Sequence, residues 1–378
     1  MTISRVLVVG GGIAGMATAI GLRRKSSGAV AVDVSELSYE GLGGVIGLFN
    51  RAADALRELG VYDELTKVND PVYLPSMLTY GPDGSVLPVN FAHPGEPDDP
   101  DAPIGVVAYR PDLAQVLAKI AAQAGARLLP VGLTVAALTN APTGVDVTFT
   151  DGGQAHYDLV VGAEGIRSSV RQSVFGDGYE PRFAGELVLR CMVDTEGLDI
   201  PGGFHIAPTG TTFFARPRAG LGYLACLLPA AEKQNLDQEQ ARLRMLEILG
   251  GFTDPTVGRL AGRIEQTEVF CRAFESVWID EPWYRDRVVV IGDAAHATSG
   301  HMGSGGAMAL EDGLVLATEL TGTGSVEERL DRFYKRRNDR VELVVKTSLQ
   351  LLELEANGQW AEFNQLIGEA QTRMLQPY

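Results

Sequence analysis

Cysteine, basic charge and long apolar runs are scarce in this 378-residue chain, and each shortage excludes a class of protein. Cys191, Cys226 and Cys271 are too few and too scattered for a disulfide framework or a zinc site. The net charge of −16 argues against nucleic acid and anionic membrane surfaces as partners. The chain contains no run of about 18 apolar residues, so no transmembrane helix is predicted. We therefore expect a cytoplasmic protein that binds no nucleic acid, no membrane and no metal.

Glycine, in contrast, is abundant and forms a motif near the start of the chain. Residues 5–10, RVLVVG, have the pattern of a buried strand, and residues 16–22 continue as an apolar helix. Between them, Gly10, Gly12 and Gly15 fit GxGxxG, with Ile13 and Ala14 inside the turn. These glycines permit a tight turn, a close approach of pyrophosphate and a close helix–strand contact. The positive end of the helix faces the diphosphate, so the segment predicts a dinucleotide site.

An acidic residue narrows the choice of dinucleotide. Glu36 stands 21 residues after Gly15, at the end of a second strand pattern formed by Val30, Val32 and Val34. A carboxylate there is placed to bind a ribose 2′-hydroxyl and to repel a 2′-phosphate. The pattern predicts NAD or FAD, whose adenosine ribose is unphosphorylated, and leaves the choice between them open.

A second glycine-rich turn lies in residues 287–312, RVVVIGDAAHATSGHMGSGGAMALED. An aliphatic strand pattern at 288–291 ends in Gly292 and Asp293, and a helical pattern begins after a cluster of glycines. An acid at a strand end, beside backbone that glycine leaves open, suits the hydroxyls and phosphate of a nucleotide-like ligand.

Two further segments separate FAD from NAD. Arg110 opens an amphipathic helix, and residues 158–171, DLVVGAEGIRSSVR, form a strand followed by Glu164 and Gly165. With RVLVVGGGIAG, Glu36, Arg110, GAEGIRSSVR and IGDAAH in this order, the chain resembles the single-component FAD-dependent aromatic hydroxylases, the para-hydroxybenzoate hydroxylase-like family. The resemblance covers most of the chain. The first motif is common to many flavoproteins, whereas the ordered set is specific.

The fold class that the resemblance implies is α/β, with an FAD-binding Rossmann-like domain of the glutathione reductase type, an inserted sheet-rich substrate domain and a C-terminal helical tail. The strand and helix patterns also indicate a nucleotide-binding part that is interrupted twice. We expect residues 1–70, 106–180 and 281–325 in the FAD-binding domain, 71–105 and 181–280 in the substrate-binding domain, and 326–378 in C-terminal helices.

The resemblance also implies the chemistry. FAD would be reduced by NADH or NADPH as a transient co-substrate, would capture O₂ as a flavin hydroperoxide, and would transfer oxygen to a small phenolic or heteroaromatic substrate. The absence of a second strand–GxGxxG–helix pattern fits a nicotinamide that binds only transiently. We expect a monomer or homodimer. The residues implied as FAD-binding are Gly10, Gly12, Ile13, Ala14, Gly15 and Glu36 for the ADP half, Arg110 and Glu164, Asp293 at the ribityl chain, and Gly303, Gly305 and Gly306 beside the flavin ring and pyrophosphate.

Substrate contacts are expected from two places. Residues 187–228 should form a sheet over the flavin face, with Arg190, His205, Phe214, Arg216 and Tyr223 as candidates, although sheet surface or core is an equal alternative for each. The loop at 300–302 should face the flavin ring and supply Met302, with His301 and Gly300 as the catalytic candidates. His301 would give a proton to a phenol or take one from it.

Four departures from the family pattern concern this same machinery. Glu164 replaces an aspartate, residues 37–50 contain no arginine or lysine, Gly300 stands where a proline is usual, and Ser304 replaces a glutamine. The missing arginine and proline bear on flavin movement, its reduction and oxygen transfer, and not on FAD binding.

Three alternatives stay open. An FAD-dependent oxidase or dehydrogenase of the same fold would oxidise its substrate without oxygen insertion. A flavin halogenase would carry a Trp-x-Trp-x-Ile-Pro segment, whereas this chain has only Trp278-Ile279 and Trp283. A non-enzymatic flavin-binding protein is permitted by the missing arginine and by the acidic segment at 93–103.

Overall fold

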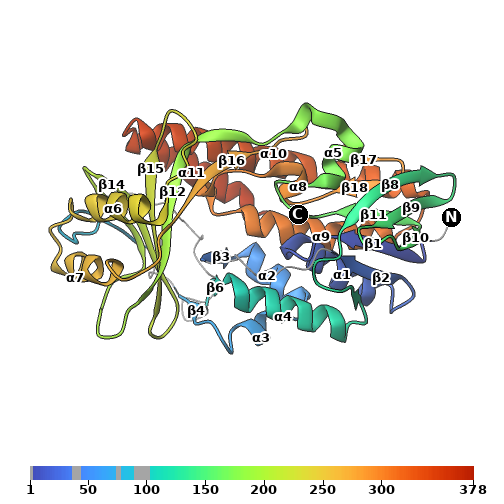
Figure 1. Ribbon diagram of the computed structural model, residues 1–378, viewed down its shortest axis with the longest axis horizontal. Coiled ribbons are helices and arrows are strands. Elements are labelled where there is room, and N and C mark those ends of the chain that lie inside the picture. The colour runs from blue at the N-terminus through green and yellow to red at the C-terminus, as the bar shows by residue number, and fades with distance from the viewer. Residues whose placement is uncertain (1–2, 36–43, 74–77, 89–102) are drawn as a thin grey trace.

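The computed structural model describes residues 3–35, 44–73, 78–88 and 103–378. Figure 1 shows an elongated molecule with one large sheet at each end. Glu36 and nearly all of the acidic segment at 93–103 lie outside the described residues.

The sheet at the right of Figure 1 carries the glycine-rich turns. Its strands run parallel except for the first, in the order β17 (Tyr284–Arg285), β18 (Val288–Val290), β11 (Leu159–Gly162), β1 (Arg5–Val9), β2 (Ala31–Ser35) and β7 (Arg127–Leu128). The valines of β1 and β18 are buried, as is usual for parallel strands that are covered on both faces. The carboxyl ends of β1, β11 and β18 therefore meet at one edge of the sheet.

Helix α1 (Ile13–Lys25) and helix α9 (Gly305–Leu320) pack closely against each other. A Cβ on Gly21 of α1 would lie 2.8 Å from the Cβ of Ala317, and one on Gly313 of α9 would lie 2.6 Å from the Cβ of Ala17. These two glycines let the helix backbones approach, and the helices that follow the two glycine-rich turns are thereby held together.

The sheet at the left of Figure 1 is mainly antiparallel. Its order is β16 (Phe270–Ser276), β12 (Arg182–Asp194), β15 (Leu221–Pro229), β14 (Gly210–Arg218), β13 (Gly203–Ala207) and β5 (Leu78–Tyr80), with only β13 and β5 parallel to each other. Helices α6 (Gln238–Leu249) and α7 (Pro255–Ile264) cover one face, where Leu189, Cys191 and Phe214 are buried. Alternate residues such as Val188 and Tyr223 point to the opposite face.

Shorter elements connect these two sheets. One small sheet has the order β3 (Val45–Phe49), β6 (Gly105–Tyr109), β4 (Pro71–Val72), and the other has the order β10 (Gln154–Tyr157), β9 (Gly144–Phe149), β8 (Val135–Ala141). The remaining short elements are α2 (Arg51–Glu58), α3 (Tyr62–Leu65), α4 (Arg110–Gln123), α5 (Ser169–Phe175), α8 (Asp293–His296), and the 3₁₀ turns η1 (Gly176–Tyr179) and η2 (Gly300–Met302).

The expected C-terminal helices are α10 (Val326–Ala356) and α11 (Trp360–Met374), drawn in red in Figure 1. Ser325 begins α10 with a capping box. Its hydroxyl accepts a hydrogen bond from the backbone N–H of Glu328, and the carboxylate of Glu328 accepts one from the backbone N–H of Ser325. None of the described helices is both long enough and apolar enough to cross a membrane.

Two elements differ from the sequence-based expectation. The apolar spacing over 50–65 indicates one helix, but the chain forms α2 and α3 because Gly60 adopts a left-handed φ of +58° between them. The apolar pattern over 264–274 indicates a strand, but β16 begins only at Phe270, and residues up to Ile264 form helix α7. Its signals were nevertheless present, since Asp254 caps the helix and Pro255 occupies its first turn.

Candidate functional site

The N-terminal turn has the geometry that its sequence predicts. Gly10 has a φ of +109°, and a Cβ on it would lie 2.3 Å from the carbonyl oxygen of Ala163. A Cβ on Gly15 would lie 1.9 Å from the carbonyl oxygen of Gly10. Both glycines are therefore required by contacts within the protein. Gly12 differs, because among the described residues its nearest neighbour would be the same Ala163 oxygen at 4.0 Å.

The second turn joins β18 to α8 and is held by a hydrogen bond to the buried carboxylate of Asp312. Gly292 has a φ of +57°, and its backbone N–H donates to Oδ2 of Asp312 at 2.9 Å. The same oxygen lies 2.7 Å from Nε2 of His296. Asp293, one residue further, is turned away from this contact: its side chain is exposed and lines the cavity described below.

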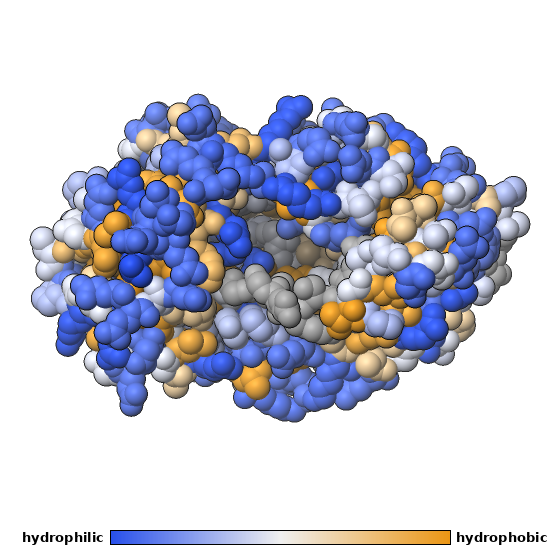
Figure 2. Space-filling view, in the orientation of Figure 1, coloured by the Kyte–Doolittle hydropathy of each residue, from blue (hydrophilic) through white to orange (hydrophobic). Residues whose placement is uncertain are grey.

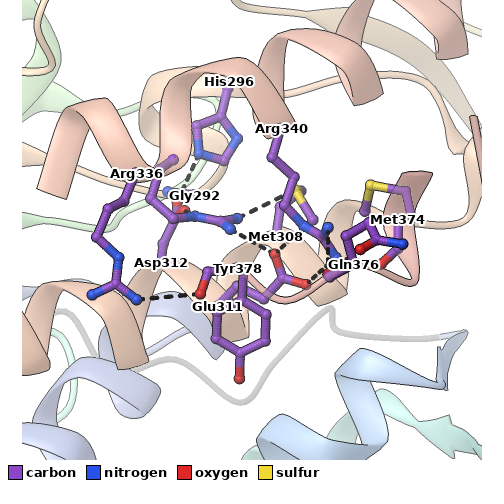
Figure 3. Close-up of polar contacts among 11 residues, drawn as sticks. Gly292, His296, Met308, Glu311, Asp312, Arg336, Arg340, Met374, Gln376 and Tyr378 are labelled. Atoms are coloured by element: carbon purple, nitrogen blue, oxygen red, sulfur yellow. Dashed lines mark hydrogen bonds and ion pairs between the residues drawn. The ribbon is translucent and has the colours of Figure 1, made fainter.

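Figure 3 shows that Asp312 belongs to a buried ionic network between α9 and α10. Arg337 is fully buried and donates to Asp312 at 2.8 Å and to Glu311 at 2.7 Å. Arg340 also donates to Glu311, and it donates to the backbone carbonyls of Met374, the last residue of α11, and of Gln376 beyond it. Burial alone raises the pKa of Asp312, but the charges and hydrogen bonds of His296 and Arg337 outweigh it and lower this pKa to about 2.

A cavity of about 700 Å³ connects the glycine-rich turns to the antiparallel sheet. This volume lies within the roughly 300–1,000 Å³ common for small-molecule and cofactor sites. Figure 2 shows the hollow at the centre of the molecule, between its two ends. The cavity wall is more apolar than polar, and four arginines reach it, namely Arg51, Arg110, Arg190 and Arg340.

Most of the predicted FAD-binding residues lie together along one side of this cavity. They are Gly10, Gly12, Ile13, Ala14, Arg110, Glu164, Asp293, Gly303, Gly305 and Gly306. Gly15 instead lies within α1 against Gly10, and Glu36 lies outside the described residues. The side chain of Asp293 is exposed to the cavity and not to bulk solvent. The surrounding protein desolvates its carboxyl group and thereby raises its pKa.

Two of these residues also have structural partners. The Glu164 carboxylate accepts hydrogen bonds from the hydroxyls of Ser168 and Ser169 and, at 2.9 Å, from the backbone N–H of Val170. It therefore caps the start of α5, which the longer side chain of glutamate can reach. Gly306 packs against β3, where a Cβ would lie 2.5 Å from Cδ1 of Ile46.

The cavity fits FAD at three glycines that no neighbouring atom of the described chain crowds, of which Gly303 also has a left-handed φ of +60° that favours glycine. A Cβ on Gly303 or Gly305 would meet no atom of the described residues within 4 Å, and one on Gly12 would only touch Ala163 at the limit of contact. All three border the cavity, so their bare backbone is open to a ligand rather than to a neighbouring side chain. The N-terminus of α1 lies at the same wall, where its backbone dipole favours an anionic pyrophosphate.

The antiparallel sheet forms the opposite wall. Arg190 and Tyr223, both predicted, lie there, together with Val188, Phe213 and Ala225. The structure does not bring the other candidates to the cavity. Phe214 is buried under α6 and α7 on the far face of the sheet, because adjacent residues of a strand point to opposite faces. His205 stacks on Tyr80, and Arg216 lies 4.0 Å from Asp199 outside the cavity.

The loop that holds Gly300, His301 and Met302 also borders the cavity, but the nitrogens of His301 face protein groups. Nδ1 lies 3.0 Å from the hydroxyl of Ser299, and Nε2 lies 3.1 Å from Glu355 and 3.5 Å from Glu186. The imidazole is only 2% exposed. To exchange a proton with a phenol in the cavity, the ring would first have to leave these partners.

Several residues at the cavity were not found from the sequence. Phe213 could have been predicted from strand alternation. It lies on β14, on the same face of the sheet as Tyr223 of the adjacent strand β15, and the two rings are in contact. Gln371, Met374 and Leu375, from α11 and the residue after it, had no such signal. They reach the cavity because Arg340 binds the backbone of this segment and Arg51 donates to the carbonyl of Leu375 at 2.8 Å.

Comparison with known proteins agrees with this geometry. The family described as "FAD binding domain" matches residues 4–195 and 261–348. The putative FAD-dependent monooxygenase YetM of Bacillus subtilis (strain 168) is 28% identical, with 99% of each chain covered. Salicylate hydroxylase of Pseudomonas putida is 28% identical over 93% of this chain and 86% of that protein.

Solved structures confirm the predicted fold class. The crystal structure of Klebsiella pneumoniae HpxO complexed with FAD and uric acid has a TM-score of 0.78 at 19% identity, and the match covers 98% of this chain and 95% of that one. The family match covers more than half of the chain and spans both glycine-rich turns. The chain therefore belongs to the FAD binding domain family, as a flavoprotein of the FAD-dependent aromatic hydroxylase type with FAD as its cofactor.

Proposed function

We propose that this flavoprotein hydroxylates a small aromatic or heteroaromatic ring that carries an anionic oxygen substituent, a carboxylate or a phenolate. NADH or NADPH supplies the electrons and O₂ supplies the oxygen atom. The observation that carries the substrate class is Arg190: its guanidinium lies in an otherwise apolar wall of the cavity, and no carboxylate of the described residues forms an ion pair with it.

The residues of the glycine-rich wall would hold the cofactor. The backbone at Gly12 and the N-terminus of α1 suit the pyrophosphate, Asp293 suits a hydroxyl of the ribityl chain, and the open backbone at Gly303 and Gly305 suits the flavin ring. When bound, FAD supplies the redox chemistry, by accepting a hydride from the nicotinamide and passing electrons to O₂. The protein supplies position, polarity and exclusion of water.

The substrate would lie between this wall and the antiparallel sheet. Phe213, Val188 and Ala225 give an apolar surface for a ring, and Arg190 and Tyr223 stand beside each other within it. Burial lowers the pKa of Arg190, which means that its charge is poorly solvated. An anionic oxygen of the substrate would compensate that charge, and a guanidinium can bind a carboxylate through two parallel hydrogen bonds.

Two related proteins carry names that fit this class. Salicylate hydroxylase is named for an aromatic carboxylate that also has a hydroxyl, and the Klebsiella structure is described as a complex with uric acid, a heteroaromatic acid. Neither name fixes the substrate of this chain, because both identities are below 30%. They support the size and the charge of the ligand that the cavity suits.

A substitution at Arg190 tests the substrate class. Arg190→Gln should retain FAD and should raise KM for aromatic carboxylates by about 10- to 100-fold, since a charge-assisted hydrogen bond contributes about 1.5–3 kcal/mol. Arg182 is an exposed residue on the same strand, so Arg182→Gln is the control and should leave both FAD retention and KM for aromatic carboxylates unchanged. Equal loss of activity toward neutral and anionic aromatics would reject the role of Arg190 in substrate charge.

We also infer that the protein is cytoplasmic and is a monomer or homodimer. All three cysteines are free, two of them buried, which suits a reducing compartment. Size-exclusion chromatography with light scattering at micromolar concentration tests the assembly, and a tetramer would contradict it.

A further inference from the structure

Three ionisable side chains meet in the interior at the junction of the two large parts of the fold. Glu186 comes from β12, His301 from η2 and Glu355 from α10, and their side chains are only 2%, 2% and 6% exposed. One atom of each, Oε2 of both glutamates and Nε2 of the histidine, lies within 4.8 Å of the other two. The segments that carry them are far apart in sequence but pack against each other.

The contact of Nδ1 shows which tautomer a neutral His301 ring adopts. The hydroxyl of Ser299 donates to the backbone carbonyl of Ser348 at 3.1 Å, which uses its only proton. Ser299 can therefore only accept from Nδ1 of His301, which lies 3.0 Å away. In the neutral ring, Nε2 then carries a lone pair directed at two carboxylates. This is how metal-binding histidines are commonly held, with the second nitrogen donating to an outer partner.

The three facing atoms lack what buried polar atoms normally have. Within the described residues, none of them makes a hydrogen bond of acceptable geometry, although the distances are those of ion pairs. No lysine or arginine of the described residues pairs with Glu186 or Glu355. Burial, with the charge of Glu355, raises the pKa of Glu186 to about 9. Two carboxylates and a lone pair in the interior require a cation or added protons for compensation.

Two of the three distances between these atoms fit a cation, and the third is no longer than 4.8 Å. Ligands about 2.0–2.2 Å from a tetrahedral Zn²⁺ lie roughly 3.3–3.6 Å from each other. Nε2 of His301 lies 3.1 Å from Oε2 of Glu355 and 3.5 Å from Oε2 of Glu186. Ser299 and His301 also border the cavity, so the cluster lies directly behind the cavity wall, with its three facing atoms buried. Imidazole and carboxylate together are suitable ligands for zinc and its neighbours in the first transition row.

We propose that Glu186, His301 and Glu355 form a binding site for one divalent transition-metal ion, with Zn²⁺ as the best fit. The ion would neutralise the two carboxylates and would join the substrate sheet, the loop beside the flavin and the C-terminal helix. Zn²⁺ has no redox chemistry, so its role would be to fix the loop at 300–302 rather than to take part in electron transfer. This assigns His301 to the metal and not to a phenol.

The test measures zinc uptake by the FAD-loaded protein without a purification tag and without substrate. After dialysis against EDTA, the protein is titrated with Zn²⁺ in competition with a chromophoric chelator, and metal content is counted by mass spectrometry after gel filtration. One equivalent per chain is expected. Failure of the wild-type protein to compete for zinc would overturn the proposal and would favour a proton-filled cluster, whether or not the protein hydroxylates aromatics.

Variants locate the bound ion. Glu186→Gln, Glu355→Gln and His301→Gln each remove a ligand at nearly constant size and should weaken zinc binding by more than the ~10-fold typical of changes beyond the ligands. Glu353→Gln, exposed on the same helix two residues from Glu355, should bind as the wild type does. Each variant is first checked for bound FAD and for its elution volume. Zinc binding that survives all three ligand substitutions would place the ion elsewhere and would also overturn the proposal.

Discussion

At the residue scale, the two glycine-rich turns show which glycines serve the protein and which serve the ligand. Neither Gly10 nor Gly15 can carry a side chain, because a Cβ on either residue would lie less than 2.5 Å from a backbone oxygen. Gly12 has no such neighbour among the described residues and borders the cavity. The sequence motif assigns the three glycines different roles, and these contacts agree with that assignment.

This difference predicts opposite effects of one added methyl group. Gly12→Ala should leave the melting temperature of the apoprotein unchanged and should weaken FAD binding by roughly 5- to 150-fold, the equivalent of about 1–3 kcal/mol of overpacking against the pyrophosphate. Gly10→Ala should instead destabilise the protein itself. Flavin fluorescence titration and thermal unfolding of the apoprotein measure the two effects. Wild-type FAD affinity in Gly12→Ala would show that the pyrophosphate lies elsewhere.

Asp312 gives a second prediction at this scale. Asp312→Asn removes one of the two carboxylates that pair with the buried Arg337 and should lower the free energy of unfolding at pH 7 by up to about 3–5 kcal/mol. The pKa of Asp312 is about 2 in the folded protein, below its ordinary 3.8, so its contribution is complete above pH 3.8 and is lost as the pH falls toward 2. Urea unfolding should show the deficit of the variant narrowing by about 1 kcal/mol between pH 5 and pH 3. A deficit that is constant over this range would contradict the assignment.

At the element scale, the turn from β18 through α8 and η2 to α9 joins nearly every part of the site. Its first half, Gly292 and Asp293, has the geometry expected of a nucleotide turn. Its second half contains Gly300, where the family usually has proline. Ser299 before it is extended, with ψ of 163°, and Gly300 is the first residue of a 3₁₀ turn without a left-handed φ. These conditions are the ones that proline accepts.

We therefore expect Gly300→Pro to be tolerated. A Cβ there would be 3.4 Å from the ring of Phe274, an ordinary contact, and the loss of freedom in the unfolded chain should stabilise the protein by about 0.4–1 kcal/mol. Chemical denaturation measures the free energy of unfolding, and flavin release measures retention of FAD. A loss of more than about 1 kcal/mol would mean that the turn depends on glycine for a reason that its geometry does not show.

At this scale, the features that could be predicted are those encoded in a local sequence pattern. Strands and helices were found where apolar residues repeat with a period of 2 or 3.6, and the ordered motifs carried the fold class. Phe214 was chosen as a substrate contact and Phe213 was not, because a strand pattern alone does not say which of its two faces is turned to the ligand. The break at Gly60 was missed because apolar spacing continues across it.

At the scale of the whole molecule, the missing information is long-range. Glu186, His301 and Glu355 are brought together by the packing of three elements, and no spacing in the sequence reveals it. The same holds for the residues of α11 at the cavity. Charge is also distributed unevenly, because a chain with a net charge of −16 places four arginines against three carboxylates, those of Glu164, Asp293 and Glu311, around one cavity. Such a cavity attracts an anionic dinucleotide and an anionic substrate that the average charge would repel.

We expect an oxygen atom from O₂ to be inserted into an aromatic ring beside Arg190. The FAD-loaded protein is supplied with NADH or NADPH under ¹⁸O₂, together with small aromatic carboxylates and phenols, and the products are analysed by mass spectrometry. An anionic aromatic should accelerate consumption of the nicotinamide, and the product should carry oxygen-18 on its ring. A product that is oxidised but carries no label would contradict oxygen insertion and would identify an oxidase or dehydrogenase of the same fold.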